Sequence, residues 1–209
     1  MHDTPLPDWL RWAREIQAMS QTGLTFSQDS YDRARYERLQ AIAAEIAASH
    51  TDLAAEYWQA QFSRQPGYAT PKVDVRGAIV SGGRILLVQE RSDERWCLPG
   101  GWADIGESPA EMVVREVREE SGMEVIPQRI VGVYDTNRAQ TPLEFFHAYK
   151  IVFLCEVVAG APQPSDETLA VDYFAPDDLP PLSLNRTSPR HLADALAAQA
   201  NPAWTAIFD

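Results

Sequence analysis

Apolar residues recur every three or four positions through the first third of the chain, which is the spacing of one face of a helix. The first apolar set is Trp9, Leu10, Trp12, Ala13, Ile16 and Met19. Gly23 is expected to break this helix. An alanine-rich pattern then continues to Phe62 and is expected to be split near residues 50–52. Residues 1–66 are therefore predicted to form an N-terminal helical extension, either a hairpin or a small bundle.

From Lys72 onward the pattern changes to short runs rich in β-branched residues, which predicts strands. The sequence Ser81-Gly82-Gly83 separates the first two runs and predicts a hairpin turn. Strands are predicted over residues 73–80, 84–89, 96–98, 131–134, 145–158 and 169–174, and a closing helix over residues 189–200. Strands mixed with a mid-chain helix and a C-terminal helix predict an α/β or α+β sandwich in residues 67–209.

The segment from residue 101 to residue 123, GWADIGESPAEMVVREVREESGM, combines a glycine-containing loop with the mid-chain helix. Ser108 is a good N-cap, Pro109 suits the first helical position, and Glu111 completes a capping box with Ser108. Gly122 suits the left-handed residue that ends a helix. The helix is therefore expected to lie between these two signals.

Three glutamates of this helix, Glu116, Glu119 and Glu120, fall within an arc of about 100° at the helical repeat. Three like charges on one face commonly form only a solvated surface. Here the preceding residues 99–101, Pro-Gly-Gly, are expected to form a sharp turn whose backbone approaches a ligand closely. Because Mg²⁺ prefers oxygen ligands and combines carboxylates with substrate phosphates, we expect a metal site that includes the carbonyl of Gly100.

The segment resembles the Nudix box, G-x5-E-x7-R-E-U-x-E-E-x-G-U with U an aliphatic residue, and it matches the box at every fixed position. The matching residues are Gly101, Glu107, Arg115, Glu116, Glu119, Glu120 and Gly122. The resemblance implies an α/β/α sandwich with a mixed sheet. It also implies hydrolysis of a nucleoside diphosphate linked to another moiety, with Mg²⁺ or Mn²⁺ as the cofactor.

The same resemblance implies roles for individual residues. Glu116 and Glu120 correspond to direct metal ligands, and Glu119 joins them or holds a bridging water. Arg115 is expected to orient these ligands. Glu107 is expected to support them by hydrogen bonding, because it precedes the helix.

A further carboxylate from a distant loop often completes the metal site of such enzymes or acts as the general base. Glu167 is the candidate, because Ser165-Asp166-Glu167 lies just before a predicted strand. The alternative is a solvated loop residue. The other contenders are Asp166, Glu144 and Glu156.

Candidate substrate contacts lie outside the box. Trp96, Tyr134 and His147 are candidates for contact with the nucleotide, and Arg91 for contact with phosphate. Aromatic residues that alternate along a strand more often belong to a core, and single arginines more often lie on a surface. Both interpretations stay open for each of these residues.

The helical extension resembles that of a Nudix subfamily whose members hydrolyse X-linked nucleoside diphosphates. ADP-ribose pyrophosphatase-like and CDP-choline pyrophosphatase-like members share this layout, and the extension implies a homodimer. One alternative function is hydrolysis of nucleoside triphosphates or RNA ends. Another is a non-catalytic nucleotide sensor, against which the complete set of box glutamates argues.

Composition and net charge limit the binding partners and the cellular location that can be expected for this chain. The net charge of −12 argues against broad binding to nucleic acid or to an anionic membrane. The cation and local arginines must therefore attract a phosphate-containing substrate at the site itself. The cysteines number 2, Cys97 and Cys155, and no apolar run resembles a membrane span or a secretory leader. A cytoplasmic location is therefore expected.

Overall fold

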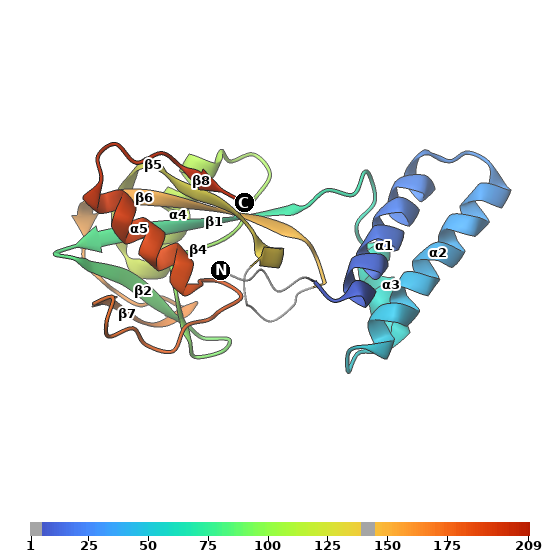
Figure 1. Cartoon of the computed structure of the whole chain (residues 1–209), viewed down its shortest axis with the longest axis horizontal. Helices are drawn as coiled ribbons and strands as arrows, with labels where there is room; N and C mark the ends of the chain where they lie inside the picture. The colour runs from blue at the N-terminus through green and yellow to red at the C-terminus, as the bar shows by residue number, and fades with distance from the viewer. Residues whose placement is uncertain (1–5, 139–144) are drawn as a thin grey trace. The chain divides into compact units, whose positions relative to one another are not determined.

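The computed structural model describes residues 6–138 and 145–209, which form two compact units. One unit ends at Pro71, and the other runs from Lys72 to Asp209 (Figure 1). The division predicted after residue 66 stays a prediction, and each unit is described by itself.

Among its described residues, 6–71, the first unit contains three helices, α1 (Asp8–Phe26), α2 (Ser30–Ser49) and α3 (Ala55–Ser63). Helix α2 begins at a true N-cap, because the side chain of Asp29 accepts hydrogen bonds from the backbone N–H groups of Tyr31 and Asp32. The predicted break near residues 50–52 is confirmed as the connection between α2 and α3. The buried side chains of this unit include Leu10, Ala13, Ala43, Ala44, Ala47, Trp58 and Phe62.

The prediction that Gly23 breaks the first helix is wrong. Helix α1 continues through Gly23 to Phe26. A Cβ atom at Gly23 would lie 2.4 Å from the ring of Tyr36 on α2. Gly23 therefore allows an aromatic ring to lie directly against the helix backbone, a long-range packing requirement that the local sequence does not show.

In the part of the second unit that the structure describes, the strands form one mixed sheet of eight. The strands are β1 (Lys72–Ser81), β2 (Arg84–Glu90), β3 (Trp96–Cys97), β4 (Gly100–Trp102), β5 (Met123–Asp135), β6 (Ala148–Gly160), β7 (Thr168–Phe174) and β8 (Ile207–Phe208). Strand β1 pairs in parallel with β6 and antiparallel with β2 and β4. Strand β5 pairs antiparallel with β6 and in parallel with β8.

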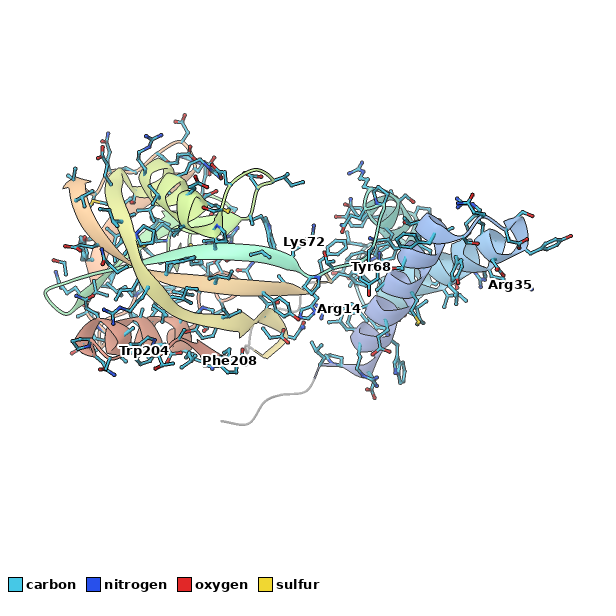
Figure 2. All side chains as sticks on the ribbon, turned by 90° about the horizontal axis from the view of Figure 1, so that it is seen from above. Arg14, Arg35, Tyr68, Lys72, Trp204 and Phe208 are labelled. Atoms are coloured by element: carbon cyan, nitrogen blue, oxygen red, sulfur yellow. The ribbon has the colours of Figure 1, made fainter. Side chains whose placement is uncertain are left out.

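Helices α4 (Pro109–Ser121) and α5 (Pro189–Ala200) cover opposite faces of this sheet (Figure 2). Met112, Val113 and Val117 of α4 pack in one apolar core with residues of β1, β2, β5 and β6. The core under α5 is contributed by Leu192, Ala195 and Ala198 together with residues from the other face of the sheet. The predicted α/β/α sandwich with a mixed sheet is confirmed, and both helices have their predicted bounds.

The predicted strands are confirmed in order, but several bounds differ. Strand β5 starts at Met123 rather than at residue 131, and its pairing with β6 shifts register on either side of Pro127. Strand β6 starts at Ala148 rather than at residue 145. The short strand β8 was not predicted, because two residues carry no periodic pattern. A single turn of 3₁₀ helix, Thr136–Arg138, follows β5.

The sharp turn predicted at residues 99–101 is also a strand in part. Gly100 and Gly101 belong to β4, where they pair with Arg76 and Val75 of β1. Gly100 has φ of 139°, and a Cβ atom there would lie 2.0 Å from the backbone oxygen of Val75. Only glycine fits this position, because both the backbone conformation and the space exclude a side chain.

Within residues 6–138 and 145–209, no helix is long and apolar enough to cross a membrane. Cys97 and Cys155 are free and buried.

Candidate metal centre and active site

Capping residues set both ends of α4, the helix that lies against strand β4. The side chain of Ser108 accepts from the backbone N–H of Glu111, whose own side chain accepts from the backbone N–H of Ser108. Gly122 ends the helix in the left-handed conformation with φ of 70°. The apolar face of α4 packs on the sheet, and this orientation brings its inner glutamates to β4.

Glu120 is the most deeply placed of these glutamates. Its Oε2 accepts a hydrogen bond of 2.8 Å from the backbone N–H of Gly100, and the residue is 7% exposed. Burial raises the pKa of the Glu120 carboxyl to about 8, against the opposing effects of Arg76 and the Gly100 N–H. Burial of this carboxyl therefore outweighs the effect of the positive and hydrogen-bonding groups around it.

Glu116 lies one helical turn earlier and faces Gly101. Both of its carboxylate oxygens lie 3.4 Å from the point where a Cβ atom of Gly101 would stand. Burial raises the pKa of the Glu116 carboxyl, and the neighbouring Arg115 opposes this shift. The carboxylates of Glu120 and Glu116 thus lie against Gly100 and Gly101, two consecutive residues of β4.

Arg115 connects the remaining acidic groups of the box. Its Nε lies 3.0 Å from both carboxylate oxygens of Glu107. Its Nη1 donates to Glu116 Oε1 at 3.0 Å and to Glu119 Oε2 at 2.9 Å. Nη2 donates to Glu107 at 2.8 Å and to Asp104 at 3.1 Å. These bonds give a physical basis for the predicted roles of Arg115 and Glu107 in orienting the other glutamates.

The donor set suits a hard divalent cation. Among residues 6–138 and 145–209, no three carboxylate, imidazole or thiol side chains are grouped so that they could hold a metal ion as placed. Mg²⁺ needs only one or two carboxylates, since water and substrate phosphates complete its shell. Glu116 and Glu120 supply such a pair beside the backbone of Gly100, while Glu119 is half exposed and bonded to Arg115.

The segment that carries Glu167 lies at the end of α4. Thr168 Oγ1 donates a 2.9 Å hydrogen bond to the backbone oxygen of Glu120, and Thr168 is buried. Arg91 holds the same segment, because its Nε donates to the Asp166 carbonyl at 2.9 Å. Glu167 itself is exposed. Of the other contenders, Glu156 accepts from Gln128 on the surface, and Glu144 lies outside the described residues.

The candidate substrate residues are described by contacts with groups other than the box glutamates. Arg91 uses Nε to hold the Asp166 backbone. Trp96 packs edge-on against Phe174 with 4.7 Å between ring centroids. Tyr134 is buried on the α5 side of the sheet and donates to Asp194 at 3.1 Å. His147 precedes β6, and its Nε2 lies 3.0 Å from Asp135 Oδ1. Their predicted contacts with substrate stay predictions.

Sequence reasoning missed Asp74, Arg76 and Thr168, all of which are buried near the site. Two charged residues at alternate positions among the apolar residues of β1 were a signal for the first two. No local pattern marks Thr168.

Comparison with known proteins agrees with this architecture in both units. Residues 7–62 match a family described as a UDP-X-like, N-terminal oligomerisation domain, and residues 71–196 match the NUDIX domain family. The Bacillus subtilis protein YjhB, whose name assigns it provisionally to the ADP-ribose pyrophosphatases, is 42% identical over 201 residues. That alignment covers 96% of this chain and 97% of YjhB.

Solved structures show the same similarity. A UDP-X diphosphatase has a TM-score of 0.62 and 34% identity, with 97% of this chain and 98% of that chain covered. An ADP-ribose pyrophosphatase from Streptococcus suis has a TM-score of 0.62 and 42% identity, with 67% of this chain and 100% of that chain covered. With the NUDIX domain matched over residues 71–196 and a full-length relative at 42% identity, the chain belongs to the Nudix hydrolase family.

Proposed function

We propose that this hydrolase is a Mg²⁺- or Mn²⁺-dependent pyrophosphohydrolase of nucleoside diphosphates linked to another moiety, such as ADP-ribose, a UDP-linked compound or CDP-choline. The observation that carries the proposal is the pair of inner carboxylates, Glu116 and Glu120, against the consecutive glycines Gly100 and Gly101. The names of YjhB and of the two solved relatives support a diphosphate-linked substrate.

In this proposal Glu116 and Glu120 would hold the cation, together with the carbonyl of Gly100, and Glu119 would contribute directly or through water. When bound, the cation polarises phosphoryl oxygens and lowers the pKa of a bound water. Arg115 keeps the glutamates oriented through its bonds to Glu107 and Glu116. Water attacks one phosphorus, and the bridging P–O bond breaks to give two phosphorylated products.

Glu167 is proposed as the base that accepts the proton of the attacking water. The bond from Thr168 to the backbone of Glu120 supports this role, because it ties the Glu167 segment to the end of α4. Arg91 serves this proposal as a support for the same segment, through its bond to Asp166.

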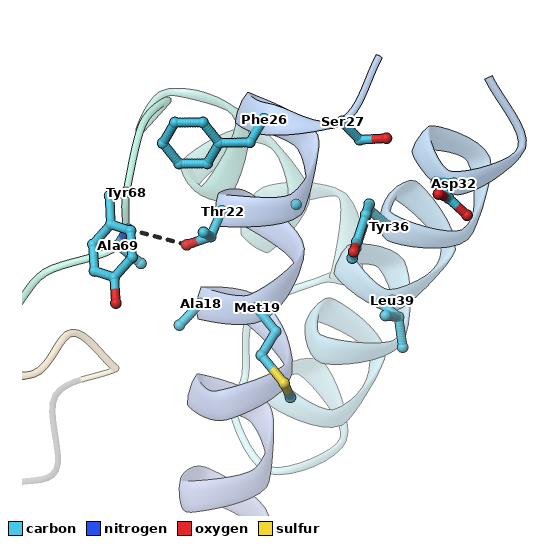
Figure 3. A pocket seen from close by; sticks show the side chains of 11 residues that line it. Ala18, Met19, Thr22, Phe26, Ser27, Asp32, Tyr36, Leu39, Tyr68 and Ala69 are labelled. Atoms are coloured by element: carbon cyan, nitrogen blue, oxygen red, sulfur yellow. Dashed lines mark hydrogen bonds between the residues drawn. The ribbon is translucent and has the colours of Figure 1, made fainter. Parts of the chain in front are cut away.

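We also propose that the helical unit joins two copies of the chain. The description of its family as an oligomerisation domain supports this. So does a hollow of about 740 Å³ that is lined by α1, the start of α2 and residues Tyr68 and Ala69 (Figure 3). Two apolar side chains at this hollow, Met19 and Phe26, are 57% and 65% exposed. Large apolar side chains that are exposed together commonly mark a surface that binds another protein chain.

The reaction is tested with a panel of ADP-ribose, UDP-glucose, CDP-choline, nucleoside triphosphates and NAD-capped RNA, each with and without Mg²⁺ or Mn²⁺. We expect two phosphorylated products from at least one diphosphate-linked compound, and only with metal. Glu116→Gln should lower kcat/KM by about 100-fold or more, since even residues that merely support a ligand cost 10- to 100-fold. If the protein hydrolyses only nucleoside triphosphates or capped RNA, the proposed substrate class is wrong and the alternative, hydrolysis of triphosphates or RNA ends, is correct.

The matched control is Glu124→Gln, which removes an exposed carboxylate just beyond α4 and should leave the rate unchanged. In the same assay Glu167→Gln should lower kcat by about 10²- to 10⁴-fold and leave Mn²⁺ affinity intact, as expected for a general base. A Glu167→Gln enzyme with full activity would remove Glu167 from the mechanism.

The stability of the metal-free protein should depend on pH through Glu120. A folded-state pKa of about 8, above the ordinary 4.5, means that the folded protein keeps a proton that the unfolded chain releases. The stabilisation is therefore complete below about pH 4.5 and is lost as pH rises through about 8. As pH rises through this window, the free energy of unfolding of Glu120→Gln should increase relative to that of wild type by up to about 1.4 kcal/mol per pH unit. Urea unfolding in EDTA near pH 5 and pH 8 measures it; an unchanged difference would contradict the raised pKa.

The dimer is tested by light scattering during gel filtration. Phe26→Lys should shift the protein from twice the mass of one chain toward a single chain, because a charge is placed in the apolar contact. Tyr31→Lys is the matched control, since Tyr31 is 76% exposed but does not line the hollow. A monomeric wild type, or a Phe26→Lys protein that stays dimeric, would refute the use of this surface.

A further inference from the structure

Three charged side chains are buried together between β1 and β6. Arg76 binds Asp74 in a bidentate manner, with Nε to Oδ1 and Nη2 to Oδ2 both at 2.9 Å. Lys150 Nζ lies 3.6 Å from Asp74 Oδ1 and donates to the backbone oxygens of Asn185 and Arg186. All three charged residues are at most 5% exposed. They therefore have almost no contact with solvent.

This group contains two positive charges and one negative charge. A buried charge without a partner is costly, so the surplus positive charge needs a nearby acceptor or anion. The remaining nitrogen of the Arg76 guanidinium, Nη1, has such an acceptor, because it donates a hydrogen bond to the backbone oxygen of Leu98 at 3.1 Å. Arg76 and Glu120 also attract each other electrostatically. Arg76 therefore faces the Leu98 backbone and contributes positive charge near Glu120.

The Leu98 backbone is held from both sides. Its N–H donates to Thr187 Oγ1 at 2.8 Å, and its carbonyl accepts from Arg76. Two residues later, the N–H of Gly100 donates to Glu120 Oε2 at 2.8 Å. The guanidinium of Arg76 is thus connected through one short stretch of backbone to the amide that orients the buried carboxylate.

We propose that Arg76 is a positioning residue of the metal centre, which fixes the Leu98–Gly100 backbone so that the Gly100 amide holds Glu120 in place to bind the cation. Asp74 in turn orients Arg76. This inference rests on the proposed metal site at Glu116 and Glu120. It assigns Arg76 no contact with substrate.

A purely structural role is the competing explanation. Gly100 pairs with Arg76 through the backbone, and the N–H of Gly77 donates to the Pro99 carbonyl at 2.9 Å. If these backbone bonds alone fix the strand, the Arg76 side chain contributes only to stability. Metal affinity separates the two explanations, because a structural role does not change the affinity of the molecules that are folded.

The test is the Mn²⁺ dissociation constant, measured by electron paramagnetic resonance on the whole chain of residues 1–209, whose folding is checked by circular dichroism. Arg76→Gln should weaken Mn²⁺ binding by about 10- to 100-fold, the range found when a residue that orients a metal ligand is lost. The variant leaves Asp74 beside Lys150, a balanced pair, so the fold retains a partner for each charge. Raising Mn²⁺ to saturation should restore most of its hydrolysis rate.

Two further proteins make the result decisive. Arg76→Lys keeps a positive charge beside Asp74 but removes the planar fork that also reaches the Leu98 carbonyl, so it should still bind Mn²⁺ weakly even if Arg76→Gln alone does not fold. Arg129→Gln is the matched control, because Arg129 also donates to backbone oxygens, those of Asn201 and Pro202, and its loss should leave Mn²⁺ affinity unchanged. Wild-type affinity in the folded Arg76 variants would overturn the positioning role alone. Failure of the wild type to bind Mn²⁺ would overturn the proposed function as well.

Discussion

The hydrogen bond from the Gly100 amide to the buried carboxylate of Glu120 is the interaction on which the site depends. It requires β4 to lie against β1 so closely that a Cβ atom at Gly100 would stand 2.0 Å from the Val75 carbonyl. Glycine alone tolerates this backbone with φ of 139°. The helix α4 meets the strand at this point because its caps set its length and its apolar face sets its rotation. A restriction on one backbone position thus determines where the negative charge of the site is buried.

That negative charge is balanced from two sides by arginines with different surroundings. Arg76 attracts Glu120 electrostatically from the buried network of β1 and is itself held by Asp74. Arg115 lies nearer the surface and joins Glu116 to Glu119 and Glu107. Burial still raises the pKa of both inner carboxyls, so the arginines leave part of the charge unbalanced. A divalent cation would balance this charge and would attract the diphosphate of the proposed substrate to a chain whose net charge is −12.

Features that depend on neighbouring residues were predictable from the sequence, and features that depend on distant partners were not. The bounds of α4 follow from Ser108 and Gly122, and its three glutamates were found from their spacing. Gly23 was misread as a helix break, because its partner Tyr36 lies on another helix. The strand character of Gly100 depends on pairing with β1, which no local pattern encodes. For Arg76 the signal was present, but its partners Asp74, Leu98 and Glu120 become visible only in the folded chain.

The claim that Glu116 and Glu120 hold the catalytic cation is tested most directly by crystals soaked in Mn²⁺, with anomalous scattering measured at the manganese edge. The expected result is an anomalous peak within about 2.0–2.2 Å of carboxylate oxygens from both glutamates, a distance typical of small hard divalent cations. A peak bound elsewhere, with Glu120 still bonded only to the Gly100 amide and Glu116 only to Arg115, would contradict the claim.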